Sequence, residues 1–314
     1  TKAARMRDAV ATGGDDQTLV DFGSRRAHGT DAGLKAARAA YVGGFDGISN
    51  VAAGRAYDLP TFGTMAHSWV QSFESERAAF AAFVDVYGDE SVLLVDTYDT
   101  LGGVRTAREV AAARGVDLAG VRLDSGDLVA LSKDVDRLLD GPGIFVSSGV
   151  DEYAIAAFLA EGGVATGFGP GTALVTSSDA PTLDAVYKLV AVERGGTLRP
   201  STKLSPGKPV YPGQKSVRRV ERDGEFRRDV LARRDESGPG EELLVPVVED
   251  GRRVVDPPSL DAVRDRRREQ VASLPADVRA LRDPGPYPVT VGADLDATAR
   301  ATRAALAARY RPEE

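Results

Sequence analysis

Residues 92–128, VLLVDTYDTLGGVRTAREVAAARGVDLAGVRLDSGDL, contain the pattern that decides the fold. Two short apolar runs, Val92–Val95 and Gly120–Leu123, each end directly in a group of polar residues. The segment between them, Leu101–Arg114, has a helical composition and stops at Gly115, a residue type common just after helix C-termini. A strand, a helix and a second strand in this order predict two parallel strands of one sheet.

The same alternation continues on both sides of this segment. Further strands are predicted at Thr18–Phe22, Phe45–Ile48, Thr61–Gly63, Ile144–Val146 and Val164–Gly167. Further helices are predicted at Asp31–Val42, His67–Phe83, Leu128–Leu139 and Glu152–Glu161. Nearly every predicted strand is followed by polar or glycine-rich residues. In a doubly wound sheet only the strands beside the switch point need such loops, whereas in a barrel all strand ends meet at one mouth. We therefore predict a parallel β/α barrel.

After about residue 180 the pattern changes to shorter strands and hairpin turns. Strands are predicted at Val186–Val192, Gln214–Arg222, Phe226–Ala232 and Leu243–Val248, and helices at Asp261–Ser273 and Ala293–Tyr310. We therefore expect a barrel with the active site over residues 1–205, and a smaller flanking α+β domain with C-terminal helices over residues 206–314.

Residues 1–8 read as the interior of a helix with no initiator Met, so we expect the chain to begin partway through a longer protein.

The composition of the 314-residue chain excludes several kinds of protein. It has no cysteine, which excludes disulfides, thiolate metal sites and thiol catalysis, and only two histidines. No apolar run reaches the roughly 18 residues of a membrane-spanning helix. The net charge of −7 and the pI near 5.1 argue against a nucleic-acid surface. We expect a cytoplasmic enzyme acting on small molecules, with neither nucleic acid nor membrane as partner.

Glycine-rich turns follow the last two predicted strands of the barrel. They are Ser148-Gly149 and the run Gly167–Thr172, which includes Gly169 and Gly171. Glycine lets backbone N–H groups approach an anion closely, and in many barrels the loops after the final strands bind phosphate. The glycines therefore predict a phosphate site, although turns that bind nothing would have the same composition.

Two arginines and one histidine also lie near predicted strand ends. Arg25 and Arg122 can present a planar guanidinium to a carboxylate or a phosphate, or form ordinary ion pairs. His67 stands at the start of an apolar helix, where it could be a general base, a nucleophile or a structural ring. His28, in an arginine-rich loop, is interpreted as structural or solvated.

Carboxylates form two D-x-x-D patterns at neighbouring strand ends, Asp96/Asp99 and Asp124/Asp127. Clustered carboxylates of this kind can hold Mg²⁺ or stabilise a developing positive charge. Alternatively, Asp96 and Asp124 cap the helices that follow, and Thr100 is a further candidate for a helix cap. Capping and function are compatible, so both interpretations stay open at this point.

Taken together, these motifs resemble the nicotinate phosphoribosyltransferase family. The motifs that carry the resemblance are DFGSRRAHG (21–29), GGFDGISNVAAG (43–54), GTMAHSWVQSF (63–73), LLVDTYDTLGG (93–103), VRLDSGDL (121–128), SSGVDEY (147–153), GFGPGTALVTSSDAP (167–181), YKLV (187–190), KLSPGK (203–208) and PGQK (212–215). Their joint occurrence in one order is highly specific, whereas residues 220–314 carry little that is diagnostic. The resemblance implies the β/α barrel of type II phosphoribosyltransferases.

The resemblance also implies an activity. The family joins nicotinate to the ribose C1 of phosphoribosyl pyrophosphate, giving nicotinate mononucleotide and pyrophosphate, with ATP as co-substrate and Mg²⁺ as cofactor. It further implies a homodimer with shared active sites. The alternatives are a nicotinamide-specific relative, and an inactive fragment that binds phosphates. Ser49, where the nicotinamide enzyme would need an acidic side chain, favours nicotinate.

Roles for individual residues follow from the resemblance alone. Phe22 would stack on the pyridine ring, and Arg122 with Ser49 would hold its carboxylate. Arg25 would bind the pyrophosphate side of the donor. The 5′-phosphate would lie in the cradle formed by Ser148, Gly149, Gly169, Gly171 and Thr172. His67 would accept a phosphoryl group from ATP, Asp96 and Asp124 would act catalytically beside it, and Asp96 with Asp99 would bind Mg²⁺.

Overall fold

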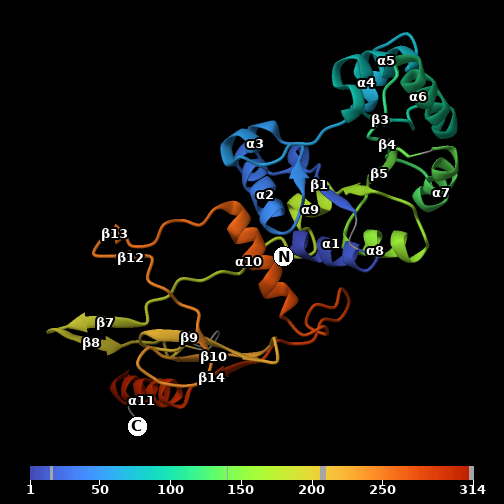
Figure 1. Ribbon diagram of the computed structural model, residues 1–314. Helices are drawn as coiled ribbons and strands as arrows, with labels where there is room; N and C mark the ends of the chain where they lie inside the picture. The colour runs from blue at the N-terminus through green and yellow to red at the C-terminus, as the bar shows by residue number, and fades with distance from the viewer. Residues whose placement is uncertain (15–16, 140, 206–209, 311–314) are drawn as a thin grey trace. The chain divides into compact units, whose positions relative to one another are not determined.

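The computed structural model describes residues 1–14, 17–139, 141–205 and 210–310, and its chain divides into two compact units (Figure 1). Unit 1 comprises Thr1–Pro181 with Leu260–Arg268, and unit 2 comprises Thr182–Ser259 with Glu269–Glu314. Residue 206, at the domain boundary expected from the sequence, and part of the KLSPGK motif lie outside the described residues. The compact units do not show which segments fold independently, so the predicted domain boundary between residues 205 and 206 stays a prediction.

Unit 1 is built on a parallel sheet with the strand order β2-β1-β6-β5-β4-β3. Its strands are β1 (Thr18–Asp21), β2 (Gly47–Ile48), β3 (Val92–Leu94), β4 (Gly120–Leu123), β5 (Gly143–Ser147) and β6 (Gly167–Gly169). Thr61 forms a parallel bridge with Ile48 at one edge, and the Thr64 hydroxyl donates a hydrogen bond to the Val92 carbonyl at the other, over 2.6 Å. Residues 61–64 thus link the two edge strands, which confirms the predicted β/α barrel.

Two of the strands predicted for unit 1 differ from the structure. The segment Thr61–Gly63 contributes only the single bridge at Thr61, because the barrel closes there through a side chain. The last strand comes later than Val164–Gly167, since glycines form it. A Cβ on Gly167 would lie 2.6 Å from the Phe145 ring, so this backbone pairs only because glycine leaves room for the neighbouring aromatic side chain.

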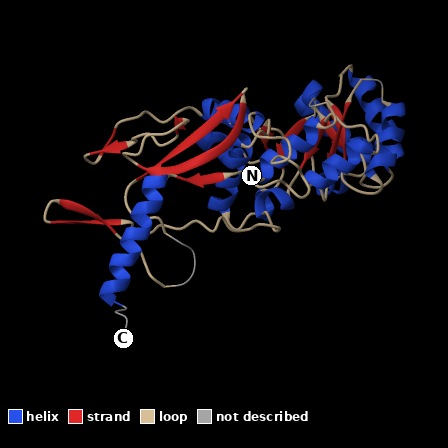
Figure 2. Ribbon diagram, turned by 90° about the horizontal axis from the view of Figure 1, so that it is seen from below, coloured by secondary structure: helices blue, strands red, loops and turns tan. Residues whose placement is uncertain are grey.

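Helices surround this sheet in the order expected for alternating strands and helices (Figures 1 and 2). They are α1 (Lys2–Ala11), α2 (Thr30–Val42), α3 (Val51–Tyr57), α4 (His67–Gln71), α5 (Glu76–Tyr87), α6 (Thr100–Arg114), α7 (Leu128–Leu138), α8 (Glu152–Ala160) and α9 (Thr172–Thr176), with short 3₁₀ turns at Ser24–Arg26 and Gly88–Glu90. The predicted helix His67–Phe83 is wrong in extent. It is broken after Gln71, and Ser75 caps a new helix by accepting a hydrogen bond from the Ala78 N–H.

The core of unit 1 follows the alternation of apolar strands and helices. Fully buried residues include Leu19, Leu93, Leu94, Leu123 and Phe168 on the strands, and Phe80 and Ile155 on the helices. Burying a side chain of this size stabilises the fold by about 1.5–3 kcal/mol before entropy costs, so these runs fix the register of the barrel. The polar residues that follow each strand are thereby held together at the strands' C-terminal ends.

Unit 2 contains a four-stranded sheet, ordered β11-β9-β10-β14, and two separate hairpins (Figure 2). Its elements are β7 (Ala191–Arg194), β8 (Thr197–Pro200), β9 (Lys215–Arg222), β10 (Glu225–Arg233), β11 (Glu241–Glu242), β12 (Val248–Glu249), β13 (Arg252–Arg253), β14 (Val289–Val291) and α11 (Ala293–Tyr310), while α10 (Leu260–Ala272) belongs in part to each unit. The predicted strand Leu243–Val248 is wrong, and Pro246 within it lacks the N–H that a central strand needs.

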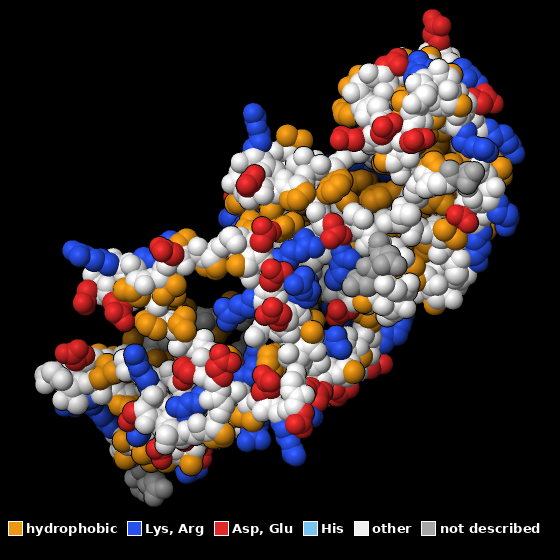
Figure 3. All heavy atoms as spheres, in the orientation of Figure 1, with side chains coloured by type: hydrophobic (Ala, Val, Ile, Leu, Met, Phe, Trp, Pro, Cys, Tyr) orange, Lys and Arg blue, Asp and Glu red, His pale blue; other side chains and the backbone are white. Residues whose placement is uncertain are grey.

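Charges of both signs are interspersed over the face of the molecule drawn in Figure 3, where Lys and Arg alternate with Asp and Glu. In the described part of the chain, no helix is long and apolar enough to span a bilayer.

Candidate active site

A cavity of about 390 Å³ opens at the C-terminal ends of the barrel strands. Its lining residues are Phe22, Arg25, Arg26, Arg122, Asp124, Ser147, Ser148, Gly149, Val150, Gly169, Gly171, Thr172, Ala173 and Ser178. The structure therefore brings together most of the residues predicted to bind substrate. The predicted site residues Ser49, His67, Asp96 and Asp99 are not part of this lining.

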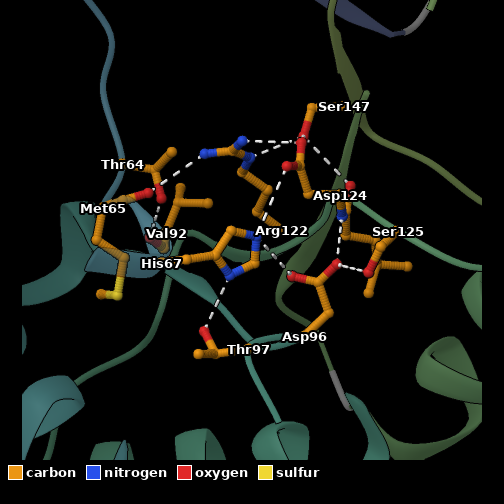
Figure 4. A network of polar contacts seen from close by, with 11 residues as sticks. Thr64, Met65, His67, Val92, Asp96, Thr97, Arg122, Asp124, Ser125 and Ser147 are labelled. Carbon is orange, nitrogen blue, oxygen red and sulfur yellow. Dashed lines mark hydrogen bonds and ion pairs between the residues drawn. The ribbon is translucent and has the colours of Figure 1, made fainter. Parts of the chain in front are cut away.

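Arg122, at the end of β4, is the centre of a polar network beside the cavity (Figure 4). Its guanidinium donates to the Ser147 hydroxyl (2.7 Å), the Met65 carbonyl (3.2 Å) and Asp124 Oδ1 (2.9 Å). The Ser147 hydroxyl in turn donates to Asp124 Oδ1 over 2.5 Å. Burial raises the pKa of Asp124, but the hydrogen bond from Ser147 and the charge of Arg122 outweigh it and leave that pKa below its usual value. The network thus holds an ionised carboxylate against a fixed cation.

The aromatic side of the cavity is formed by Phe22, which follows β1. The Arg122 guanidinium carbon lies 5.3 Å from the centroid of the Phe22 ring, and Phe145 packs on the same ring at 5.5 Å. A Cβ on Gly169 would lie 2.6 Å from the ring. Gly169 is therefore needed because it leaves the space that Phe22 occupies, and an aromatic face and a guanidinium stand side by side.

His67, the first residue of α4, lies between two carboxylates of neighbouring strand ends (Figure 4). Its Nδ1 is 3.1 Å from the Thr97 hydroxyl, which orients the ring. Its Nε2 is 3.7 Å from Asp124 Oδ2 and 3.9 Å from Asp96 Oδ1. Asp124 therefore connects the cavity with His67, because it lines the cavity and also faces the imidazole ring.

In each of the two D-x-x-D patterns, the first and the second aspartate have different contacts. In each, the second aspartate caps the following helix: Asp99 accepts from the Gly102 N–H (2.7 Å) and Asp127 from the Ala130 N–H (3.1 Å). The first aspartate of each pattern instead faces His67. The interpretation of Asp96 and Asp124 as helix caps is therefore wrong, and so is Thr100 as the cap of α6.

Asp96 has the features of a cation ligand. Its Oδ2 accepts hydrogen bonds from the Asp124 N–H (2.8 Å) and the Ser125 hydroxyl (2.7 Å). Its Oδ1 is buried, and no residue of the described chain donates a hydrogen bond to it. A buried carboxylate oxygen without a donor fits a divalent cation. The described residues contain no group of three or more histidines and carboxylates that would hold a metal without further ligands.

The loop after β1 is shaped by a buried carboxylate that the sequence did not single out. Asp21 Oδ1 accepts the Gly23 N–H over 2.7 Å and so folds the turn that presents Arg25 and Arg26 to the cavity. Burial raises the pKa of Asp21, partly offset by the Gly23 N–H. The Ser49 hydroxyl donates to the Asp21 carbonyl over 2.7 Å, so it supports this loop from behind.

Sequence reasoning missed several residues of the site, among them Arg26, Thr97, Ser147 and Ser178. Ser147 and Arg26 are the sequence neighbours of two predicted substrate-binding residues, Ser148 and Arg25. The position of these pairs at a strand end was the available signal, but it could not show which neighbour faces Arg122 or the cavity.

The sequence profile described as the nicotinate phosphoribosyltransferase (NAPRTase) family matches residues 17–220, the part of the chain that carries the barrel and its cavity. The chain belongs to the nicotinate phosphoribosyltransferase family. A second profile of this family, its C-terminal domain, matches residues 239–298, although the sequence motifs there were uninformative.

Individual members of the family are similar to this chain. It is 50% identical over 300 residues to the Mycobacterium tuberculosis protein named nicotinate phosphoribosyltransferase pncB2, covering 93% of this chain and 63% of that protein. A Bacillus subtilis nicotinate phosphoribosyltransferase is 43% identical over 230 residues, covering 70% of this chain and 46% of that protein. The chain thus spans less than two thirds of the length of these relatives.

The fold is shared as well. The crystal structure of human nicotinic acid phosphoribosyltransferase superposes with a TM-score of 0.78 at 27% identity, covering 95% of this chain and 72% of that chain. A nicotinate-nucleotide pyrophosphorylase from Pyrococcus furiosus superposes with a TM-score of 0.71 at 27% identity, covering 87% of this chain and 69% of that chain. These superpositions support the assignment of the type II phosphoribosyltransferase barrel.

Proposed function

We propose that this protein transfers the phosphoribosyl group of phosphoribosyl pyrophosphate to nicotinate, giving nicotinate mononucleotide and pyrophosphate with ATP as co-substrate. The observation that carries the proposal is one cavity in which an aromatic ring, a largely buried arginine and glycine-rich loops meet. A pyridine carboxylate and a phosphorylated sugar require these three features in one place. Family membership supports the same conclusion.

Nicotinate would lie against Phe22 with its carboxylate toward Arg122. The Arg122 side chain is only 15% exposed, so an ion pair formed there is screened little by solvent. Ser49 stays a predicted carboxylate ligand, although its hydroxyl is engaged with the Asp21 carbonyl. The ring nitrogen then attacks ribose C1 as the bond from C1 to the pyrophosphate oxygen breaks.

The donor's charged groups match the cationic and glycine-rich parts of the cavity. Arg25, with Arg26 beside it, would bind the pyrophosphate as it departs. Ser148, Gly149, Gly171 and Thr172 would surround the 5′-phosphate, and a Cβ on Gly149 would meet no atom within 4 Å, which leaves open space beside that backbone. Asp124, held ionised by Arg122 and Ser147, would stabilise the positive charge that develops on the ribose.

His67 is the proposed acceptor of the γ-phosphoryl group of ATP. The pyridine nitrogen carries no proton that attack must remove, so phosphoribosyl transfer has little use for a general base. Thr97 fixes the imidazole through Nδ1, which leaves Nε2 facing Asp96 and Asp124. A Mg²⁺ ion held by Asp96 would neutralise phosphate charge beside these carboxylates. Asp99 remains a predicted ligand, although its carboxylate caps α6.

The nicotinamide-specific alternative would need an acidic side chain facing the carbonyl group of the substrate. The acidic side chain of this cavity, Asp124, is already paired with Arg122 over 2.9 Å. The pair presents a cation to the ring substituent, which favours a carboxylate over an amide. Homodimerisation with shared active sites and a cytoplasmic location remain further predictions.

The decisive experiment measures nicotinate-dependent release of pyrophosphate from phosphoribosyl pyrophosphate, with and without ATP. We expect release that requires nicotinate and is stimulated by ATP, with nicotinamide a poor substitute. Release driven equally by nicotinamide would favour the alternative enzyme. Donor binding without release under any condition would indicate the phosphate-binding fragment.

A further inference from the structure

We propose that Lys2 is a positioning residue, whose ammonium group ties together two loops that line the cavity, one of which holds residues of the proposed 5′-phosphate site. This inference rests on the function proposed above only for the identity of the ligand. The loops are residues 148–151, between β5 and α8, and residues 177–180, after α9. Both contribute to the cavity lining, through Ser148, Gly149 and Val150 in the first and Ser178 in the second.

The contacts of Lys2 join the two loops directly. Its Nζ lies 3.0 Å from both carboxylate oxygens of Glu152, in the first turn of α8 directly after the first loop. The same Nζ donates to Asp179 Oδ2 in the second loop over 2.7 Å. The Lys2 side chain is only 10% exposed, and that of Glu152 is fully buried. One ammonium group thus links segments that are separated by α8, β6 and α9 in the sequence.

Both loops contain a residue whose backbone needs such support. Ser148 has φ 74° and Ser177 has φ 42°, and residues other than glycine rarely adopt such left-handed backbone conformations. A conformation of this kind persists only where the surrounding contacts enforce it. Each strained serine lies close in sequence to a carboxylate that Lys2 holds, Glu152 or Asp179.

The charges agree with this arrangement. Burial lowers the pKa of Lys2, but hydrogen bonds to Asp179 and Glu152 outweigh it and leave that pKa above its usual value. The hydrogen bond from Lys2 likewise lowers the pKa of Asp179. Arg5 also donates to Glu152, over 3.0 Å, and to the Tyr153 hydroxyl, over 3.0 Å. The ammonium of Lys2 contacts both loops, whereas the contacts of Arg5 described here are with Glu152 and Tyr153 at the first loop, so substituting Lys2 should affect the second loop more.

The test compares Lys2→Met with the matched control Arg5→Met, which also removes one cation from Glu152. Amide hydrogen exchange measures how often the backbone of each loop opens, and it requires no ligand. We expect Lys2→Met to accelerate exchange about tenfold or more at residues 148–150 and 178–180, whereas Arg5→Met leaves 178–180 unchanged. Asp179→Asn, at a half-exposed position, should accelerate exchange at 178–180 alone. Lys2→Arg should restore slow exchange, because a guanidinium can also bridge two carboxylates.

A kinetic readout connects the loops to the donor. In Lys2→Met, the KM for phosphoribosyl pyrophosphate should rise about tenfold while the KM for nicotinate stays within about twofold. Asp179→Asn should raise the donor KM less, because its ion pair with Lys2 is half exposed. Equal effects of Lys2→Met and Arg5→Met on both loops would overturn the proposal, as would unchanged exchange at 178–180 in Lys2→Met. If the wild type releases no pyrophosphate, the proposed function fails, and exchange alone then decides the role of Lys2.

Discussion

The substitution Arg122→Met tests the proposed carboxylate site most directly, because methionine keeps an apolar stem of similar length and removes only the guanidinium. In the native protein this group satisfies Ser147, Met65 and Asp124 and lies against Phe22. Asp124 keeps the hydrogen bond from Ser147, so the expected loss in free energy of unfolding is about 1–3 kcal/mol. The fold should therefore persist.

The expected loss in catalysis is larger. A largely buried arginine that pairs with a substrate carboxylate contributes about 2–4 kcal/mol, which corresponds to a decrease of about 30- to 1,000-fold in kcat/KM for nicotinate. Nicotinamide carries no charge for Arg122 to bind, so the discrimination between the two substrates should fall together with kcat/KM. Initial-rate measurement of pyrophosphate release with each substrate provides both numbers.

The matched control is Arg114→Met, which removes an arginine from the surface ion pair with Asp85. Such an exposed pair contributes little to stability, and kcat/KM should not change. If Arg122→Met unfolds at nearly the native temperature and uses nicotinate as efficiently as the wild type, then Arg122 does not hold the substrate carboxylate and our interpretation of the cavity is wrong.

Three further substitutions test separate parts of the site. His67→Ala should abolish ATP hydrolysis and ATP stimulation but leave slow ATP-independent synthesis, and acid-labile label from γ-labelled ATP should disappear from the protein; label that persists would exclude His67 as acceptor. Gly169→Ala should displace Phe22, since its Cβ would lie 2.6 Å from that ring, and should raise the KM for nicotinate severalfold more than that for the donor; the reverse order would show that Gly169 contacts phosphate. Asp21→Asn keeps an acceptor for the Gly23 N–H but removes a carboxyl whose pKa is raised by burial. Such a carboxyl stabilises the fold at low pH and loses this effect as pH rises through its folded pKa, so the variant's melting temperature should exceed that of the wild type at pH 7 but not near pH 3; parallel pH curves would contradict this.

The amino-acid sequence alone determined the class of fold and the place of the site. Apolar runs such as Val92–Leu94 and Gly120–Leu123 are strands because burial of their side chains outweighs any local alternative, and polar residues after them must collect at one end of a parallel sheet. The motifs sufficed to identify the family. They also predicted that Phe22, Arg122 and Asp124 lie at one mouth of the barrel, and all three line its cavity.

Only the tertiary structure decided which member of each polar group faces which partner. Asp96 and Asp99 are chemically identical and three positions apart, yet one faces His67 and the other caps α6, because the end of the strand and the start of the helix fix their directions. Likewise β6 could not be located from its own residues, since Gly167 and Gly169 pair where the rings of Phe145 and Phe22 fill the space beside them.

The ion pairs around Glu152 are the clearest example of contacts that local sequence cannot predict. Nothing in the sequence near Lys2 indicates that its ammonium reaches Glu152 and Asp179, because their proximity results from the packing of α1 against α8 and the return of the chain after α9. Local composition determines helices, strands and turns through short-range preferences. Contacts between distant charges depend instead on how those elements pack, which is a property of the whole barrel.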